Sequence, residues 1–378
     1  MPLGQPLFWS FLLAHFLIFV FLTNRVSFHP RGFIPEILWT PFWTLIFLTA
    51  QGLPSVFLSR RWDFTISDWP ALPLEGKFFV GGVGFWALWI CADYCLWTFY
   101  FKQPVDARLT RRFDAKVPDL KAPYGFLKAF GLENQLYQPE VVEYEVRLPH
   151  WPKEFSGLSL VQISDLHFGK YIHRGYLEAV VVEAKKLKPD FFALTGDFIS
   201  FQKDIPAIKG LLKGFKAPLG AYALLGNHDY WADAVGVRRM LEKDGLRVLK
   251  DEVVYHKRKG KTLAILGADD LWNGARNEGP LLKVKADAKI LLAHHPDHFF
   301  LAKQTGAHLQ LSGHCQGGQI CFPLIGPLIV PSAHGRKYAA GFIRRGDQTL
   351  FIHRGIGGYP PLRTFCRPQI VKLVLISA

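Results

Sequence analysis

The chain of 378 residues carries a formal net charge of +14, and 49% of its residues are hydrophobic. This length allows two or three domains. Its five cysteines form neither the paired CxxC motifs of a zinc site nor the even-numbered framework of a small disulfide-bonded secreted domain. Residues 1–101 contain five Lys/Arg and five Asp/Glu, so the whole net charge belongs to residues 102–378. The sequence therefore predicts a membrane-embedded region at 1–101 followed by a basic, soluble-looking domain.

Three apolar runs in residues 1–101 are candidates for membrane spans. Residues 7–23 lack an ionised side chain and are near the lower length limit of a spanning helix. A cleaved signal peptide is the alternative, but no basic residue precedes the run and no A-x-A-like site follows it. The run 37–58 contains two prolines and is either a kinked span or a re-entrant segment. The run 78–101 contains one acid, Asp93, and ends in aromatic residues typical of the membrane interface. We expect two or three spans.

Residues 102–140 are predicted to be a basic, proline-containing linker that packs in part on the following domain. Its first twenty residues carry six basic side chains, opposed by only Asp106, Asp114 and Asp119. The basic residues are Lys102, Arg108, Arg111, Arg112, Lys116 and Lys121. By the positive-inside rule, this excess places the following domain in the cytoplasm. The same residues would attract anionic lipid headgroups.

From residue 141 onward, strand and helix patterns alternate. The expected strands are 141–148, 158–163, 191–194, 221–225, 262–266, 290–293 and 308–311, followed by a β-rich tail to 375. The expected helices are 176–187, 205–215 and 235–244. This alternation predicts an α/β domain over 141–378, in which functional residues lie at the carboxyl ends of strands.

Oxygen and imidazole donors follow five of these strands. They are Asp165, His167, Asp197, Asn227, His294 and His314. Such a donor set suits Mn²⁺, Fe²⁺, Zn²⁺ or Mg²⁺ rather than metals that prefer thiolates. A single aspartate after a strand is often only a turn or capping residue. Five strand ends with the same chemistry predict a metal site.

In chain order, the motifs resemble those of the calcineurin-like metallophosphoesterases, D-x-H, G-D, G-N-H-D, H and G-H-x-H. Here they are Asp165/His167, Gly196-Asp197, Gly226-Asn227-His228-Asp229, His294 and Gly313-His314-Cys315-Gln316. The turn at 267–270 and the stretches 317–319 and 354–368 resemble the membrane-attached bacterial branch in particular. The resemblance implies a four-layer α/β/β/α sandwich preceded by the transmembrane region. It also implies two divalent metal ions, manganese first, with magnesium, iron or zinc as alternatives.

The resemblance also implies a role for each motif residue. The first metal would be held by Asp165, His167 and Asp197, and the second by Asp197 as a bridge together with Asn227, His294 and His314. The implied chemistry is in-line attack on phosphorus by a water that the two ions activate. His228 would stabilise phosphoryl charge or protonate the leaving group, and Asp229 would orient its imidazole. His295 and His298 are interpreted as bystanders.

One position departs from the family pattern. The last ligand of the family is the second histidine of G-H-x-H, and this chain has Gln316 there. An amide oxygen is a weaker and neutral donor, so the first metal is expected to bind less tightly or to be a harder ion. The other six ligand positions are retained, which favours an active enzyme.

An anchored enzyme with a basic surface favours a membrane-associated, anionic substrate. We expect hydrolysis of UDP-2,3-diacylglucosamine to UMP and 2,3-diacylglucosamine 1-phosphate, a step of lipid A biosynthesis, at the cytoplasmic face of a bacterial inner membrane. The alternatives are a less specific phosphodiesterase or phosphatase on nucleotides or phospholipid headgroups, and a non-catalytic membrane scaffold. A nucleic-acid partner is disfavoured because aromatic residues do not interleave with basic ones in the domain. Acyl chains would meet Phe198, Ile199, Trp231 and Trp272, although core packing explains these residues equally well.

Overall fold

The computed structural model describes residues 104–378, apart from 276, 324, 325 and 328, together with Phe85, Leu88 and Ala92. The chain divides into two units, Met1–Lys102 with Ala333–Lys337, and Gln103–Ser332 with Tyr338–Ala378. The fold and the site below belong to the second unit. The expected spans at 7–23 and 37–58, and nearly all of 78–101, lie outside the described residues. Within the described part, no helix has both the length and the hydrophobicity needed to cross a membrane.

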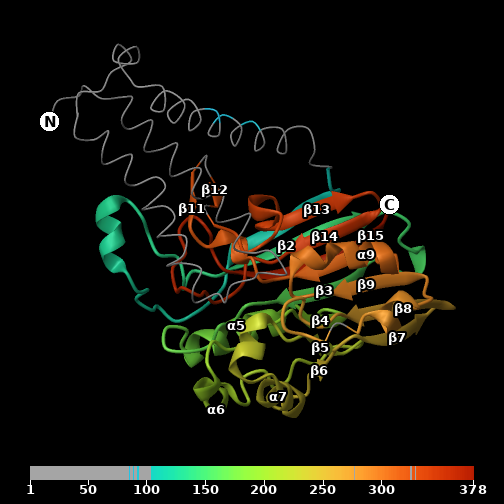
Figure 1. Cartoon of the computed structure of the whole chain (residues 1–378), viewed down its shortest axis with the longest axis horizontal. Helices are drawn as coiled ribbons and strands as arrows, with labels where there is room; N and C mark the ends of the chain where they lie inside the picture. Colours follow the sequence, from blue (N-terminus) through green and yellow to red (C-terminus); the bar gives the residue numbers. More distant parts are fainter. Residues whose placement is uncertain are drawn as a thin grey trace, which may run out of the picture. The chain divides into compact units, whose positions relative to one another are not determined.

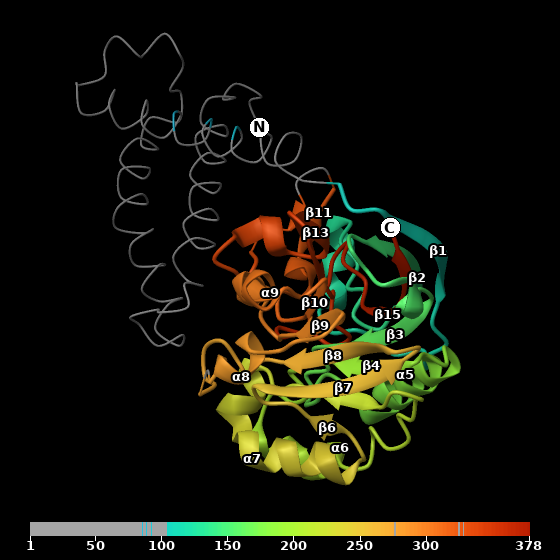
Figure 2. The ribbon, with the colours of Figure 1, turned by 90° about the vertical axis from the view of Figure 1, so that its right-hand side faces the viewer.

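The first sheet has seven strands in the order β1-β2-β15-β3-β4-β5-β6 (Figure 1; β1 is labelled in Figure 2). Their bounds are β1 Ala107–Asp114, β2 Glu140–Leu148, β3 Leu158–Ile163, β4 Phe191–Leu194, β5 Ala221–Ala223, β6 Arg247–Val248 and β15 Gln369–Ser377. Strands β3 to β6 are parallel to one another. Strand β15 is antiparallel to β3 and parallel to β2, and β1 closes the edge antiparallel to β2.

The second sheet has six strands in the order β13-β14-β10-β9-β8-β7. Their bounds are β7 Glu252–Arg258, β8 Lys261–Gly267, β9 Ala288–Leu292, β10 Leu309–Ser312, β13 Gly341–Arg345 and β14 Gln348–Ile352. The four inner strands are parallel, and the edge strands β7 and β13 are antiparallel to their neighbours. A small hairpin, β11 (Cys321–Phe322) with β12 (Gly326–Pro327), follows β10.

Alternation along each strand separates three apolar layers. In β3, Leu158 and Leu160 lie in the cluster between the two sheets, while Val161 and Ile163 face the opposite side. That opposite side is covered by α5 (Arg174–Lys186), α6 (Ile205–Ile208) and α7 (Asn227–Lys243). A third cluster joins the outer face of the second sheet to α8 (Gly279–Leu282) and α9 (Phe299–Thr305). The layers are therefore helix, sheet, sheet and helix, and Figure 2 shows α6 and α7 gathered at one end and α9 beside β9 and β10.

Strand predictions at 158–163 and 191–194 are confirmed, but two helix predictions are corrected. The predicted helix 205–215 is only the four residues of α6, because Gly210 and Gly214 adopt left-handed backbones with φ of 80° and 84°. The predicted helix 235–244 begins eight residues earlier, at Asn227. Asp233 interrupts it with extended backbone (φ −175°, ψ 88°), so the apolar periodicity was clear only beyond that residue.

The predicted linker at 102–140 also needs correction in part. Residues 107–114 form β1, the edge strand of the first sheet. Two of its basic side chains pair with acids of β2, Arg111 with Glu143 at 2.9 Å and Arg112 with Glu140 at 3.1 Å. Part of the basic stretch is thus integrated into the domain.

Candidate metal centre

The seven predicted metal ligands converge from loops of both sheets. Asp165 and His167 follow β3, Asp197 follows β4, and Asn227 is the first residue of α7 after β5. His294 follows β9, and His314 and Gln316 follow β10. Because parallel strands end at the same edge of a sheet, these loops meet there. All seven residues are buried, none with more than 6% of its surface exposed.

Backbone strain is concentrated at the same positions. Five of the seven residues have positive φ: Asp165 55°, His167 46°, Asp197 58°, His314 65° and Gln316 49°. Non-glycine residues adopt this region rarely, and each instance costs about 1–3 kcal/mol. Such strain persists only where the surroundings fix the backbone, and it concentrates at functional sites. The left-handed positions therefore indicate a site that the fold holds in place.

Two motif glycines are required by close packing. A Cβ atom on Gly226 would lie 2.2 Å from Asp197 Oδ1. A Cβ atom on Gly313 would lie 1.9 Å from Ser164 Oγ and 2.4 Å from Asp165 Oδ2. Real Cβ atoms do not approach so closely, so a side chain at either position would displace a predicted ligand.

The first half of the site contains Asp165, His167 and Gln316. The Nε2 atom of His167 lies 4.0 Å from Asp165 Oδ1 and 3.6 Å from Asp197 Oδ2. The Gln316 amide nitrogen lies 2.6 Å from His167 Nε2 and 3.4 Å from Asp165 Oδ1. Gln316 Oε1 is buried without a hydrogen-bond partner among the described residues. A half-turn of the amide would bring that oxygen to the same place as the nitrogen, facing the other donors.

The second half contains Asn227, His294 and His314. Asn227 Oδ1 lies 3.2 Å from His294 Nε2 and 3.0 Å from His314 Nδ1. Asp197 Oδ2 lies 3.2 Å from His294 Nε2, so this oxygen is near both halves, as a bridging ligand must be. His294 Nδ1 lies 2.6 Å from the carbonyl of Thr195. A proton on Nδ1 would be donated to that carbonyl and would leave Nε2 unprotonated, with its lone pair directed toward the site as a metal ligand.

The electrostatics of this cluster favour a bound cation. Burial raises the pKa of the Asp165 carboxyl to about 7. Burial alone would lower the pKa of His294, but Asp197 raises it to about 10. Burial, reinforced by His228, lowers the pKa of His167 to about 3. The carboxylate of Asp197 thus stabilises positive charge on His294, while the His167 imidazole stays neutral. A divalent ion bound here would replace the second proton of the His294 imidazole. The donors present fit divalent metal ions.

His228 lies beside the first half of the site. Its backbone N–H donates to Asp197 Oδ1 at 2.9 Å, and its ring stands edge-to-face 4.7 Å from the His167 ring. Ligand atoms of His167, Asp197 and His228 all lie within 4.8 Å of one another. Burial lowers the pKa of His228, so its imidazole is neutral near pH 7. His228 therefore borders the first half of the site, and its role in catalysis stays a prediction.

The predicted role of Asp229 is corrected. Its carboxylate was expected to orient the His228 imidazole, but it accepts hydrogen bonds from four backbone amides instead. Oδ2 accepts from Asp197 and Gly226, both at 2.9 Å, and Oδ1 accepts from Phe198 at 2.8 Å and Ile199 at 3.3 Å. Asp229 therefore fixes the loop that carries Asp197 to the beginning of α7, which carries Asn227.

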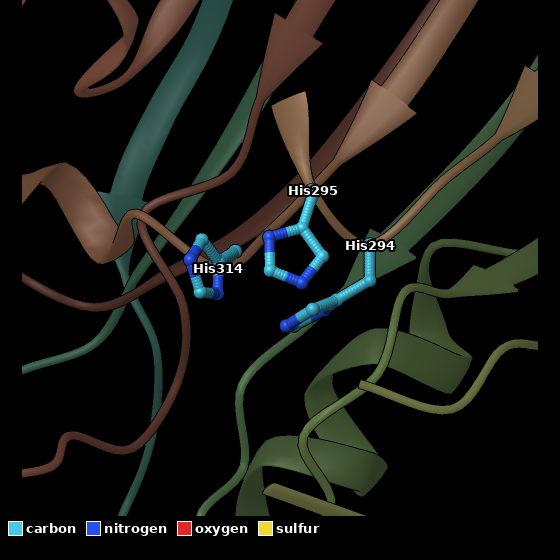
Figure 3. A group of neighbouring side chains, drawn as sticks. All are labelled: His294, His295 and His314. Atoms are coloured by element: carbon cyan, nitrogen blue, oxygen red, sulfur yellow. The ribbon is translucent and has the colours of Figure 1, made fainter. Parts of the chain in front are cut away.

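The interpretation of His295 as a bystander missed its place in this buried cluster. Its Nε2 lies 2.8 Å from Asp270 Oδ1, and its ring centroid lies 3.9 Å from that of His314. Figure 3 shows the rings of His294, His295 and His314 facing one another, and their ligand atoms lie within 4.8 Å. The adjacent histidines and the aspartate pair at 269–270 were the available signals. By contrast, His298 pairs with Glu278 at 3.0 Å.

Arg363 was also missed. It is fully buried, and its Nε donates to the carbonyl of Gly357 at 2.6 Å, while Nη1 donates to the carbonyl of Gln316 at 3.4 Å. The guanidinium thereby connects the Gln316 loop to the segment after β14. An arginine in a loop has no sequence signal for burial, because most arginines are exposed.

Comparison with known proteins agrees with this geometry. A family model described as calcineurin-like phosphoesterase matches residues 158–315. The metallophosphoesterase YkuE of Bacillus subtilis is 32% identical over 247 residues, covering 63% of this chain and 86% of that protein. Phosphodiesterase YaeI of Escherichia coli is 26% identical over 238 residues, covering 61% and 86%. A transmembrane protein with metallophosphoesterase domain of Danio rerio is 30% identical over 278 residues, covering 67% and 61%. The chain therefore belongs to the calcineurin-like metallophosphoesterase family and is a metal-dependent phosphoesterase.

Proposed function

We propose that the protein hydrolyses a phosphodiester or pyrophosphate bond in a membrane-associated substrate, specifically UDP-2,3-diacylglucosamine, to release UMP. The observation that carries the reaction class is the convergence of seven buried donors, among which Asp197 lies near both halves of the site. The proposal places the catalytic domain at the cytoplasmic face of a bacterial inner membrane. Manganese is the proposed metal, with magnesium, iron or zinc as alternatives.

Three observations support a substrate at a membrane. Arg108, Lys116 and Lys121 are exposed near the beginning of the domain, where they would attract anionic headgroups. The apolar composition of residues 1–101 supports an anchor. The relative from Danio rerio is itself named a transmembrane protein.

The residues of the chain divide the catalytic work. Asp165, His167, Asp197 and Gln316 would hold one cation, and Asp197, Asn227, His294 and His314 the other. Two such cations supply an activated water and neutralise phosphoryl charge. His228 would donate a hydrogen bond to a phosphoryl oxygen or to the leaving-group oxygen. Asp229 would hold Asp197 and Asn227 in position relative to each other, through its hydrogen bonds to the backbone amides around them.

A less specific phosphodiesterase is the second candidate, favoured by the similarity to phosphodiesterase YaeI. A non-catalytic scaffold is favoured only by Gln316 in place of histidine. The retention of six other donors in one buried cluster argues against it.

The test uses the detergent-purified full chain with Mn²⁺ or Mg²⁺ and measures UMP release from UDP-2,3-diacylglucosamine. Asp197→Asn removes a bridging carboxylate and should abolish release. Asp347→Asn, in the turn between β13 and β14 at the opposite end of the strands, should leave it unchanged. Hydrolysis of a generic aryl phosphodiester without UMP release would exclude the substrate and keep the chemistry. Failure on both substrates with metal bound would support the scaffold.

A further inference from the structure

Two exposed aromatic side chains, Trp231 and Tyr359, contact the ring of His228, and a third, Phe201, contacts Tyr359. We call Phe201, Trp231 and Tyr359 the aromatic collar. Their exposed fractions are 47%, 45% and 50%. The Trp231 ring centroid lies 4.7 Å from that of His228, and the Tyr359 centroid lies 5.1 Å from it. Phe201 contacts Tyr359 with centroids 6.3 Å apart. The three side chains come from the loop after β4, from α7 and from the segment after β14.

The collar is continuous with the metal centre. Tyr359 also stacks near the ring of His167, with centroids 6.2 Å apart and an interplanar angle of 28°. Single exposed apolar residues are ordinary on protein surfaces. The three collar side chains form a contiguous group beside one candidate catalytic histidine, and contiguous exposed apolar groups mark binding sites. A group attached to a phosphate at the centre would lie within reach of these rings.

The chemistry of the collar favours a flat aromatic group over an acyl chain. Base–aromatic stacking is sequence-tolerant and strong, because every base has a π-face. Trp231 Nε1 donates to Asn273 Oδ1 at 3.1 Å, which holds the indole in one orientation. Phe198 and Ile199, two of the four residues expected to meet an acyl chain, are 1% and 0% exposed and belong to the core. The acyl role expected of these two residues is therefore corrected.

Positive charge adjoins the collar. Lys203 is exposed, and its Nζ lies 5.5 Å from the centroid of the Phe201 ring. An ammonium group beside aromatic rings and a cation-binding centre matches a ligand that combines a base with phosphate groups.

We propose that the aromatic collar binds the nucleobase of a nucleotide ester and so sets the preference of the enzyme for nucleotide-containing substrates. This inference rests on the proposed phosphoesterase function. Tyr359 and Trp231 are the specificity-determining residues, because both contact His228.

The test compares two chromogenic diesters that share the p-nitrophenolate leaving group, uridine 5′-(p-nitrophenyl) phosphate and methyl p-nitrophenyl phosphate. Only the retained group differs, a uridine in one ester and a methyl group in the other, so the ratio of their kcat/KM values reports recognition of the nucleoside. A change of this ratio in a variant of the collar reports the contribution of the aromatic rings. Replacing both residues (Tyr359→Ala with Trp231→Ala) should lower this ratio roughly tenfold to a hundredfold, mainly through KM of the nucleotide ester. Tyr359→Phe should retain it. Tyr255→Ala removes an aromatic residue of β7 that is 53% exposed and should leave the ratio unchanged.

Each outcome bears on the inference. An unchanged ratio in the double variant, with both esters hydrolysed, would overturn it while leaving the phosphoesterase function intact. A third diester with an octyl group distinguishes the occupants, since a loss confined to octyl p-nitrophenyl phosphate would assign the collar to an acyl chain. If no ester is hydrolysed and no UMP is released from UDP-2,3-diacylglucosamine, the proposed function fails, and equilibrium dialysis with UMP still decides the inference. The double variant should then bind UMP at least tenfold more weakly than Tyr255→Ala, and equal binding would overturn the proposal.

Discussion

Replacing Asp229 with asparagine exchanges one of its two carboxylate oxygens for an NH₂ group. Each oxygen accepts hydrogen bonds from two backbone amides, so two amide donors would face a third donor. A buried donor left without an acceptor costs about 1–3 kcal/mol, so two such amides cost about 2–6 kcal/mol. The side chain is fully buried, and water cannot substitute for the lost oxygen. We expect the free energy of unfolding to fall by that amount, a large share of the typical 5–15 kcal/mol or so.

The assay pairs urea unfolding of the full chain in detergent with metal affinity measured by competition against a chelating indicator. Asp229→Asn should weaken metal binding as well as stability, because its partners position Asp197 and Asn227. Asp244→Asn is the matched control. Its carboxylate accepts from the amides of Gly210 and Leu212, both at 3.1 Å, at the far end of α7. This control should lose stability and keep wild-type metal affinity.

A different result would refute the reasoning. If Asp229→Asn unfolds at the wild-type urea concentration and changes only the pH dependence of hydrolysis, the carboxylate acts on the His228 imidazole. The hydrogen bonds to the backbone would then be incidental to function.

Three further predictions concern other parts of the molecule. Gln316→His restores an imidazole ligand beside His167. In chelator competition, the metal affinity should rise by about tenfold, equivalent to about 1.4 kcal/mol. Equal or lower affinity would show that the side chain at this position does not bind the metal. Gly313→Ala places a Cβ atom 2.4 Å from Asp165 Oδ2, so the purified variant should retain little metal by elemental analysis, whereas full occupancy would contradict the packing argument. Burial lowers the pKa of His353 from 6.5 to about 3. Between pH 6.5 and pH 3, the His353 imidazole therefore takes up a proton in the unfolded chain but not in the folded protein. The free energy of unfolding should fall as the pH falls through this range. His353→Asn should remove about 1.4 kcal/mol per pH unit from that slope between pH 6 and pH 4 in urea unfolding, and an unchanged slope would be evidence against a buried neutral imidazole.

The strand ends could be predicted because a buried parallel strand is a continuous apolar run that stops abruptly at a polar residue. Strands 158–163 and 191–194 therefore have the predicted bounds, and Asp165 and Asp197 lie where those runs end. The beginning of α7 could not be read in this way. Its first turn carries Asn227 and Asp229, which are polar and buried and so do not follow the apolar periodicity of an amphipathic helix.

Roles that depend on three-dimensional neighbours were beyond the sequence. Asp229 was assigned to its neighbour in sequence, but its partners include Phe198 and Ile199, some thirty residues away. The collar likewise joins Phe201 to Tyr359, which lie on separate loops. Hydrophobic periodicity cannot predict such contacts, because loops have no regular repeat of inward-facing and outward-facing residues.

The position of β15 has a consequence for how the protein reaches its folded state. Strand β15 inserts between β2 and β3, and its pairing with β2 joins residues 229 positions apart in sequence, such as Gln369 and Glu140. The β1-β2 pair and the β3-β4-β5-β6 strands therefore cannot join into one sheet until β15, the last strand in the sequence, inserts between β2 and β3. Closing so large a loop is entropically costly and slows folding. Until then, β2 and β3 present unpaired edges that are prone to association with other chains. We expect refolding to be slow and limited by the docking of β15, and a chaperone that covers these edges would raise its yield.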